Sequence, residues 1–299
     1  MKNIVVTGAT GFIGSYLVHE LLIDKENHVI AVIRENSKNK SKLELHPNLE
    51  TIECSMEHIS NLPKLVQKDI DIFYHLAWDG IRNEDRENMQ IQKNNYLNSI
   101  QALIAARKMK ATRFIGVGSQ AEYGESDSKI TEDSPTNPTS EYGKAKLQFF
   151  KDGLSISQYL GINFIWGRVF SAYGYGDYED SLISMLVRNI KHKKETCLSP
   201  CKKKWDFIHV SDVVRALVSI QNAPSGAYNI SGGDIRELRD YVYEIMTITN
   251  SEKYIKFGKT MNLKYNENGF QPDIKKIRET CDWIPIVNFS DGIKELFRN

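Results

Sequence analysis

The chain has 299 residues, of which 41% are hydrophobic, so it can bury a large core and extensive disorder is excluded. Its 39 basic and 38 acidic residues nearly cancel, which argues against a nucleic acid or a membrane surface as a partner and favours small molecules. Four cysteines without the spacing of zinc or redox motifs predict free thiols, no metal site and a cytoplasmic location.

Short β-branched runs alternate with longer helical patterns through the first half of the chain, which is typical of a parallel sheet with crossover helices. The expected strands are Ile4–Thr7, Val29–Ile33, Leu49–Ile52, Ile72–His75, Arg113–Val117 and Asn163–Arg168. The expected helices are Gly11–Leu22, Glu87–Met109 and Tyr142–Tyr159, the last of them capped by Ser140 or Glu141. This order predicts an α/β protein with a Rossmann-type, doubly wound parallel sheet.

A glycine-rich turn joins the first strand to the first helix, with two residues between successive glycines. Glycines allow a tight turn and a close backbone approach, while the free N–H groups at the positive end of the helix attract a pyrophosphate. Because the run lies between a strand and a helix, it predicts a dinucleotide site, although an ordinary tight turn is the alternative. We expect this site to include Gly8, Thr10, Gly11, Phe12, Ile13 and Gly14.

The second expected strand ends at Ile33 and Arg34, without an acidic residue at its tip. A carboxylate there would bind the ribose hydroxyls of NAD and repel a 2′-phosphate, whereas the guanidinium of Arg34 would attract that phosphate. We therefore expect NADP(H) to be preferred over NAD(H). The alternative is that Arg34 stacks on the adenine or points to solvent.

Tyr142 and Lys146 are four residues apart, on one face of an expected helix. A phenol with a pKa of about 10 is a poor acid at neutral pH, but a nearby cation lowers that pKa. Ser119 ends an expected strand, at the edge where open α/β sheets bind ligands, and its hydroxyl can polarise a carbonyl. Together these residues predict a catalytic trio of Ser119, Tyr142 and Lys146; a surface Tyr–Lys pair and a loop-capping serine are the alternatives.

After Arg168 the alternation gives way to mixed elements separated by turns such as Ala223–Gly226. We expect residues 1–168 to form the dinucleotide-binding domain, to which residues 206–228 return, and residues 169–299 to form a smaller mixed α/β lobe for the substrate. Two basic runs in this lobe, Lys191–Lys194 and Lys202–Lys204, either form a solvated face or contact a substrate diphosphate.

These motifs, in this order, resemble the extended short-chain dehydrogenases, also called the NAD-dependent epimerase/dehydratase family. The likeness covers nearly the whole chain and includes the runs Phe73–Ala77, Arg168–Gly174, Asp206–Val213, Tyr228–Gly233 and Asp282–Pro285. It implies an enzyme acting on a nucleotide-activated sugar, whose nucleotide is held by the smaller lobe. It implies cofactor contacts from Leu76, Ala77, Asn95, Tyr142, Lys146 and Val169, and substrate contacts from Trp78, Ser119, Gln120, Ala121, Tyr142, Ser171 and Trp205.

The chain departs from the family pattern at several positions. Ser171 stands where a substrate-contacting asparagine is common, Trp205 where many members have an arginine, and Ser55 where an aspartate usually bonds to adenine. The run Gln120–Glu122 lacks the Asp–Glu pair with which the family's 4,6-dehydratases eliminate water. The resemblance therefore disfavours dehydration.

The narrower likeness is to bacterial nucleotide-sugar 4-keto reductases of the kind that make dTDP-fucose or CDP-abequose. It implies NAD(P)H-dependent reduction of the C4 keto group of a dTDP- or CDP-linked 4-keto-6-deoxy sugar, for surface polysaccharides such as O-antigen. The alternatives are an NAD-retaining nucleotide-sugar 4-epimerase and a non-catalytic NAD(P)-binding redox sensor. The helices Glu87–Met109 and Tyr142–Tyr159 resemble those through which relatives dimerise, so we expect a homodimer.

Overall fold

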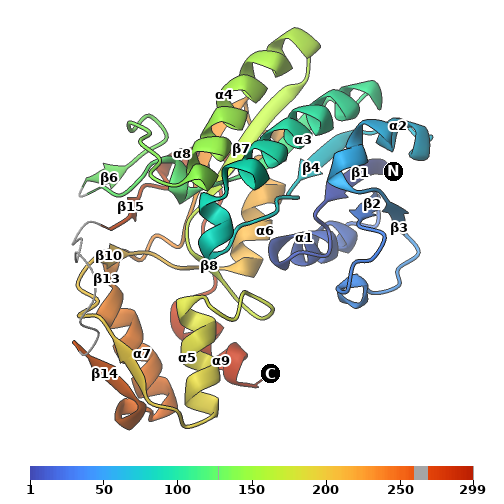
Figure 1. Ribbon diagram of the computed structural model, residues 1–299. Helices are drawn as coiled ribbons and strands as arrows, with labels where there is room; N and C mark the ends of the chain where they lie inside the picture. The colour runs from blue at the N-terminus through green and yellow to red at the C-terminus, as the bar shows by residue number, and fades with distance from the viewer. Residues whose placement is uncertain (127, 259–268, 299) are drawn as a thin grey trace.

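The computed structural model describes residues 1–126, 128–258 and 269–298. Within these ranges the central element is a seven-stranded sheet in the order β12-β7-β5-β4-β1-β2-β3, and every pair of neighbouring strands is parallel (Figure 1). The strands are β1 (Lys2–Thr7), β2 (Asn27–Ile33), β3 (Leu49–Glu53), β4 (Ile72–His75), β5 (Arg113–Ser119), β7 (Asn163–Val169) and β12 (Gly226–Ile230). This is the expected Rossmann-type arrangement.

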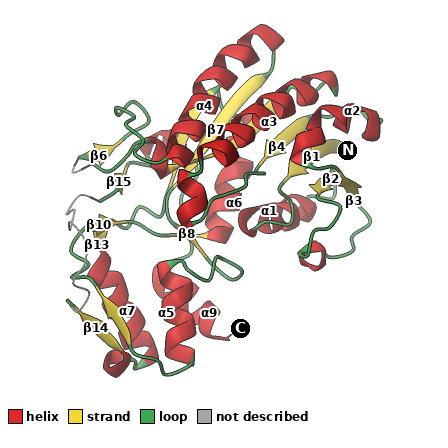
Figure 2. Ribbon diagram, viewed as in Figure 1, coloured by secondary structure: helices red, strands yellow, loops and turns green. Residues whose placement is uncertain are grey.

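Helices cover both faces of the sheet, as Figure 2 shows. One face packs against α1 (Phe12–Ile23), α6 (Val210–Ser219) and α8 (Lys275–Cys281), and the other against α2 (Leu62–Leu65), α3 (Met89–Lys108) and α4 (Glu141–Leu160). A sheet buried on both faces needs continuous apolar strands, which explains runs such as Ile4–Val6.

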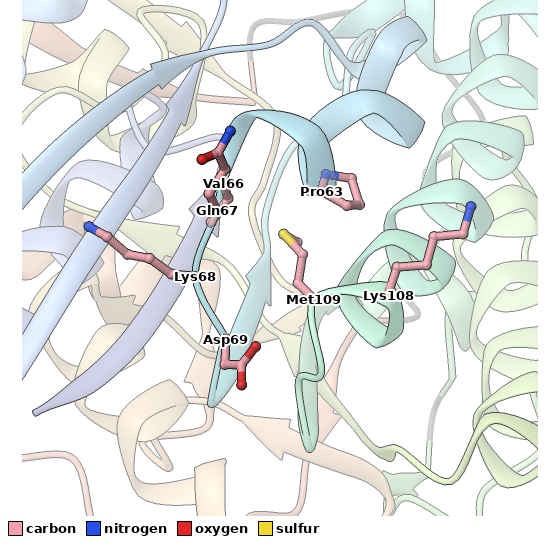
Figure 3. A pocket seen from close by; sticks show the side chains of 7 residues that line it. All are labelled: Pro63, Val66, Gln67, Lys68, Asp69, Lys108 and Met109. Atoms are coloured by element: carbon pink, nitrogen blue, oxygen red, sulfur yellow. The ribbon is translucent and has the colours of Figure 1, made fainter.

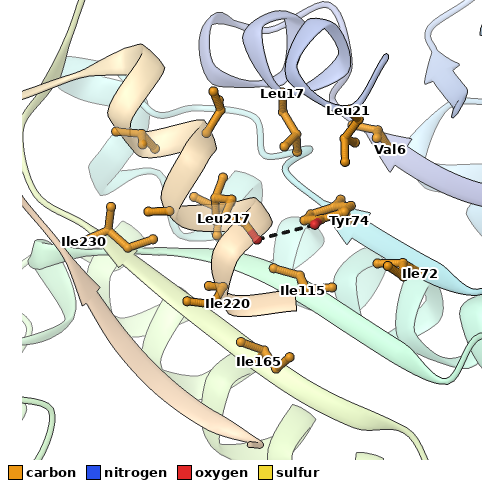
Figure 4. Packing of buried hydrophobic residues seen from close by; sticks show 14 of the residues in the cluster. Val6, Leu17, Leu21, Ile72, Tyr74, Ile115, Ile165, Leu217, Ile220 and Ile230 are labelled. Carbon is orange, nitrogen blue, oxygen red and sulfur yellow. Dashed lines mark hydrogen bonds between the residues drawn. The ribbon is translucent and has the colours of Figure 1, made fainter. Parts of the chain in front are cut away.

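The core on the α1 side is drawn in Figure 4. Leu17 and Leu21 of α1 and Leu217 of α6 pack on Ile115 and other strand residues, and all of them are buried. The Tyr74 hydroxyl donates a hydrogen bond to the carbonyl of Leu217, at 3.4 Å. Burial of these side chains supplies the main driving force for folding, at about 25 cal/mol per Å² of apolar surface.

The C-terminal half builds a second apolar cluster. Its helices α5 (Leu182–Lys191), α7 (Leu238–Thr249) and α9 (Phe289–Arg298) pack together beside the parallel pair β9 (Thr196–Leu198) and β14 (Ile255–Phe257), in the lower part of Figure 1. Three further short pairs are β8 (Ala172–Tyr173) with β11 (Ile208–His209), β10 (Lys204–Trp205) with β13 (Arg236–Glu237), and β6 (Lys129–Ile130) with β15 (Gln271–Pro272). We interpret the cluster as the smaller lobe: the chain leaves the sheet at the end of β7, next to the expected boundary at residue 168, and returns to it with α6, β12 and α8, a longer return than the expected residues 206–228.

Short 3-10 helices complete the connections. They are η1 (Lys40–Lys42), η2 (Met56–Asn61), η3 (Asn83–Glu87), η4 (Gln120–Glu122), η5 (Ile220–Asn222) and η6 (Glu252–Tyr254). None of the helices within the described ranges has the length and apolar character needed to cross a membrane.

All six expected strands lie in the sheet, and the helix ends differ by one or two residues because of capping. Gly11 is the N-cap of α1 rather than its first residue. Helix α3 starts at Met89, two residues later than expected, since the side chain of its N-cap Asn88 accepts hydrogen bonds from the N–H groups of Gln90 and Ile91. Ser140 caps α4 in the same way, accepting from Gly143. The seventh strand, β12, was not predicted.

Candidate active site

The glycine turn between β1 and α1 leaves no room for side chains. Gly8 has a φ of 69°, and a Cβ there would lie 2.7 Å from the backbone nitrogen of Ala77. A Cβ on Gly14 would overlap the carbonyl oxygen of Gly8. Gly11 caps α1 without a side-chain hydrogen bond, so the first N–H groups of this helix remain available. This cradle fits the pyrophosphate of a dinucleotide.

Arg34 and Thr10 lie on the β2 side of this turn. The Arg34 guanidinium is 3.3 Å from the Asp79 carboxylate, and both side chains are about two-thirds exposed, at 69% and 65%. The Thr10 hydroxyl is 3.1 Å from that of Ser37 in the loop after β2. Phe12 and Ile13 form the first turn of α1. Arg34 is therefore accessible to a ligand, but it has an acidic neighbour.

The loop after β4 is fixed by Asn95 of α3. The Asn95 side chain accepts a hydrogen bond from the Asp79 N–H at 3.0 Å and donates one to the Asp79 carbonyl at 2.7 Å. The preceding Leu76 donates its N–H to the carbonyl of Thr7, at 3.2 Å. Leu76 and Ala77 are thereby held beside the glycine turn, while Val169 ends β7 opposite Ser119. The expected cofactor residues thus share the carboxyl edge of the sheet.

Ser119 and Tyr142 meet where α4 touches the turn after β5. Ser119 ends β5, and its hydroxyl lies close enough to the Tyr142 phenol to lower the pKa of that phenol. The contact depends on Gly143, because a Cβ at this position would overlap the carbonyl oxygen of Ala121. A glycine therefore allows the first turn of α4 to approach η4 closely. Two residues 23 positions apart in the sequence are brought next to each other in this way.

Lys146 lies one helical turn below Tyr142 and is buried. Its ammonium donates a hydrogen bond to the carbonyl of Val117 at 2.7 Å and lies 3.7 Å from the centre of the Trp78 ring. It is 5.8 Å from the centre of the Tyr142 ring. Burial lowers the pKa of Lys146 to about 7, and the charge of Glu122 opposes this change.

The electrostatics of Tyr142 involve a residue that the sequence did not point to. Burial raises the pKa of the phenol, and the largest opposing effect comes from the guanidinium of Arg86, ahead of that of the Ser119 hydroxyl. The Arg86 guanidinium carbon lies 4.4 Å from the centre of the Tyr142 ring. Because Arg86 comes from η3, outside any recognised motif, no local signal could have identified it.

Glu122 is fully buried beside the site, beneath the Ser119 turn, rather than exposed in it. Its carboxylate accepts hydrogen bonds from the Ser119 N–H at 2.8 Å and the Arg168 Nε at 2.8 Å, and also from the Trp166 indole. Arg168 in turn donates to the Tyr123 hydroxyl at 2.7 Å. The Glu122 carboxylate is thus paired with Arg168 and hydrogen-bonded on both oxygens, and its role is to stabilise the turn that carries Ser119.

The expected substrate residues fall into two groups. Trp78 lies edge-to-face with Tyr142, at 6.2 Å between ring centres, and Gln120 accepts a hydrogen bond from the Ser171 hydroxyl at 3.1 Å. Ser171 has a φ of 34°, a backbone conformation that asparagine adopts more readily than serine. Trp205 belongs instead to an aromatic cluster with Phe270, at 5.3 Å, in the smaller lobe.

A surface cavity elsewhere on the molecule is drawn in Figure 3. Its lining includes Lys68 and Asp69, which precede β4, and Met109, which precedes β5. These residues therefore mark the amino edge of the sheet, opposite the glycine turn and Ser119. The cavity is not part of the candidate active site.

The Rossmann-type sheet, the glycine turn and the placement of Ser119, Tyr142 and Lys146 define the class of protein, which is that of the extended short-chain dehydrogenases. The sequence pattern of the NAD dependent epimerase/dehydratase family matches residues 4–231, and the chain belongs to this family.

Relatives and solved structures match nearly the full chain at low identity. A Bacillus subtilis protein described as an uncharacterized UDP-glucose epimerase, YtcB, is 25% identical and aligns over 97% of this chain and 95% of its own. The dTDP-4-dehydro-6-deoxyglucose reductase of Escherichia coli is 25% identical and aligns over 100% of this chain and 97% of its own. The structure of UDP-glucuronic acid 4-epimerase from Bacillus cereus, in complex with UDP-glucuronic acid and NAD, superposes with a TM-score of 0.85 at 25% identity. The superposition covers 99% of this chain and 98% of that one. Identity alone does not choose between epimerases and reductases.

Proposed function

We propose that this protein reduces the C4 keto group of a dTDP- or CDP-linked 4-keto-6-deoxy sugar, with NAD(P)H as the hydride donor. The observation that carries the proposal is the placement of the Ser119 hydroxyl beside the buried Tyr142 phenol. Burial raises the pKa of Tyr142, so the phenol is protonated at neutral pH and serves as a proton donor, as reduction requires. The E. coli reductase that resembles this chain over its full length supports the substrate class. We place the reaction in the synthesis of surface polysaccharide precursors.

In this reaction a bound nicotinamide supplies the hydride. The Tyr142 hydroxyl gives its proton to the carbonyl oxygen of the sugar, while the Ser119 hydroxyl hydrogen-bonds the same oxygen and orients it. The buried ammonium of Lys146 would hold the ribose of the cofactor, and the N–H groups after Gly11 would hold its pyrophosphate. Trp78, Gln120, Ala121 and Ser171 line the sugar, and Trp205 stacks on the nucleotide base.

Dehydration is disfavoured because elimination of water needs a further acid and base beside Tyr142. Gln120 and Ala121 carry no titratable group, and the charge of Glu122 is bound to Arg168 and to the Ser119 turn. Both carboxylate oxygens of Glu122 already accept hydrogen bonds within this network.

For the cofactor we propose a preference for NADP(H). Arg34 follows the last residue of β2, is largely exposed and can form a charge-assisted pair with a 2′-phosphate. Asp79 neutralises part of that charge, so its orientation on cofactor binding sets the size of the preference.

The second candidate is an NAD-retaining nucleotide-sugar 4-epimerase, which the B. subtilis relative and the B. cereus structure favour by their descriptions. In that reaction Tyr142 first removes a proton from the C4 hydroxyl and later returns it. Cofactor stoichiometry distinguishes the two functions, because an epimerase causes no net change in the absorbance of reduced nicotinamide.

The decisive experiment incubates the protein with NADPH or NADH and a panel of dTDP-, CDP-, GDP- and UDP-linked 4-keto-6-deoxy sugars, with product structures determined by NMR. We expect one substrate to consume reduced cofactor one for one and to yield a C4 alcohol. Inversion of a 4-hydroxy sugar nucleotide without cofactor consumption would instead establish the epimerase. A lack of turnover with every substrate would favour a redox-sensing role.

We further propose a cytoplasmic homodimer that pairs α3 and α4 with their copies. These helices expose apolar side chains, including Met89 at 70%, Leu97 at 48% and Tyr159 at 91%. A monomeric mass in solution, measured by light scattering, would contradict this assembly.

A further inference from the structure

Arg86 packs directly against Tyr142, the proposed proton donor. Its guanidinium carbon lies over the face of the Tyr142 ring, 4.4 Å from the ring centre, and the side chain is half-buried. A guanidinium over an aromatic face is attracted by the negative charge of the π system, and more strongly by a phenolate than by a phenol. The contact therefore favours the form of Tyr142 that remains after it has given up its proton.

The ammonium of Lys146 is less directly placed for this purpose. It donates to the Val117 carbonyl and covers the Trp78 ring, at a greater distance from the Tyr142 ring than Arg86. Its burial brings its own pKa to about 7, so Lys146 is only partly charged near neutrality. A guanidinium, in contrast, keeps its charge throughout the working pH range.

The segment that carries Arg86 is anchored to the site. Gln92 of α3 donates hydrogen bonds to the carbonyls of Gly80 and Asp85, at 2.8 and 3.0 Å, and accepts one from the Trp78 indole at 2.9 Å. The Glu87 carboxylate accepts the N–H of Glu141, the first residue of α4, at 3.3 Å. The η3 turn is thus tied both to Trp78 and to the helix that bears Tyr142.

We propose that Arg86 is a positioning residue for Tyr142: it holds the ring against Ser119 and supplies the permanent positive charge that stabilises the phenolate formed by proton transfer. In the balanced step, the O–H bond of Tyr142 breaks, its proton goes to the oxygen of the reduced carbonyl, and the phenolate later regains a proton from water. The proposal rests on the catalytic role of Tyr142 given above.

Several other charged or titratable groups face Tyr142. They are Lys146 on the same helix, Glu122 of η4 and Tyr178 in the loop after β8. Ser119 and Trp78 are its uncharged polar and aromatic neighbours. Their side chains are unchanged in a variant of Arg86, so a difference in Tyr142 reports on Arg86.

The η3 segment also offers a matched control. The Arg82 guanidinium carbon lies 4.3 Å from the centre of the Tyr178 ring, so it makes the same kind of contact with a different tyrosine. Arg82→Met removes the same charge from the same segment as Arg86→Met and spares the Tyr142 contact.

The test measures ionisation of Tyr142 by NMR of the full chain with ¹³C-labelled tyrosine, with the resonance assigned from Tyr142→Phe. In Arg86→Met and in Arg86→Gln we expect the pKa of Tyr142 to rise by about one pH unit, so that its ionised fraction at a fixed alkaline pH falls about tenfold. Arg86→Lys should recover most of the ionisation, and Arg82→Met should match the wild type. An unchanged pKa in the two neutral variants, or an equal shift in Arg82→Met, would overturn the proposal.

The same variants give a kinetic readout once a substrate is known. Loss of phenolate stabilisation should lower kcat about tenfold and leave KM nearly unchanged. An effect on KM alone would show that Arg86 binds substrate and would overturn the positioning role. Because the NMR titration needs neither substrate nor turnover, its result is independent of whether the proposed reduction is correct.

Discussion

Glu122 and Arg168 form an ion pair that solvent does not reach, with side chains 0% and 2% exposed and 2.8 Å between Oε2 and Nε. The pair joins the turn after β5 to strand β7, and the same carboxylate fixes the N–H of Ser119. Removing one partner would leave an uncompensated charge in a medium of low polarity.

We therefore expect Arg168→Met to lower the free energy of unfolding by about 3–5 kcal/mol, measured by urea denaturation. The double variant Glu122→Leu with Arg168→Met should lose less stability than the sum of the single variants, because it leaves neither charge alone. Lys110→Met, which removes an exposed ion pair with Asp69, is the control and should change stability by less than about 1 kcal/mol. If Arg168→Met behaved like this control, the pair would have no structural role.

Tyr142→Phe removes the proton donor and keeps the ring. We expect turnover to fall at least about 100-fold, since general acid catalysis contributes about 10²–10⁴-fold, while the dissociation constant of the dinucleotide stays nearly unchanged. Steady-state rates and fluorescence titration measure the two quantities. Tyr159→Phe, at an exposed position of the same helix, should behave as the wild type. Near-normal turnover in Tyr142→Phe would refute the assignment.

Lys146 should give stability a pH dependence in the absence of bound cofactor. Burial lowers its pKa from the ordinary 10.5 to about 7. Between these two values the unfolded chain binds the proton that the folded chain lacks, so this residue makes stability rise with pH. Below about pH 7 its destabilising contribution is fully present.

The comparison of wild type with Lys146→Met isolates this contribution. The wild type should gain stability relative to the variant as the pH rises from 7 to 10, measured by denaturant titration at each pH. Lys151→Met, at an exposed position of α4, should show no such trend. A constant difference between wild type and Lys146→Met would mean that the ammonium is better solvated than its burial implies.

The pair of Arg34 and Asp79 should control the choice of cofactor. Arg34→Ser is expected to weaken NADPH binding about tenfold and to leave NADH binding nearly unchanged, because a charge-assisted contact contributes about 1.5–3 kcal/mol. Asp79→Asn, which frees the guanidinium, should tighten NADPH binding. Isothermal titration calorimetry gives both constants, and tighter binding of NADH by the unaltered protein would refute the preference for NADP(H).

Most of the sheet could be predicted from the sequence because strands such as β1 and β2 are buried on both faces and contain continuous apolar runs. The edge strand β3 has no fully buried residue and mixes polar with apolar residues, and β12, whose Tyr228 and Asn229 interrupt an apolar run, was not predicted. Asn229 is buried all the same, because its side chain accepts a hydrogen bond from the Tyr123 hydroxyl at 2.7 Å. That partner is 106 residues away, so the strand is specified by a tertiary contact.

The candidate site was predictable only where local motifs mark it. The glycine turn and the helix carrying Tyr142 and Lys146 have short-range signatures, and the structure places both at the carboxyl edge of the sheet. Arg86 has no signature, since its contact with Tyr142 spans 56 positions. The fully buried state of Glu122 likewise depends on Arg168, 46 residues away.

The close approach at Gly143 has a further consequence. Since the α4 backbone rests directly on the carbonyl of Ala121, the phenol and the serine hydroxyl are set at a fixed separation before any ligand arrives. The entropy of aligning these two groups is lost once, when the chain folds, and is not lost again in each catalytic cycle. Even the methyl group of an alanine at position 143 would push the two groups apart, so the absence of a side chain there sets the distance between the two groups that act on the substrate.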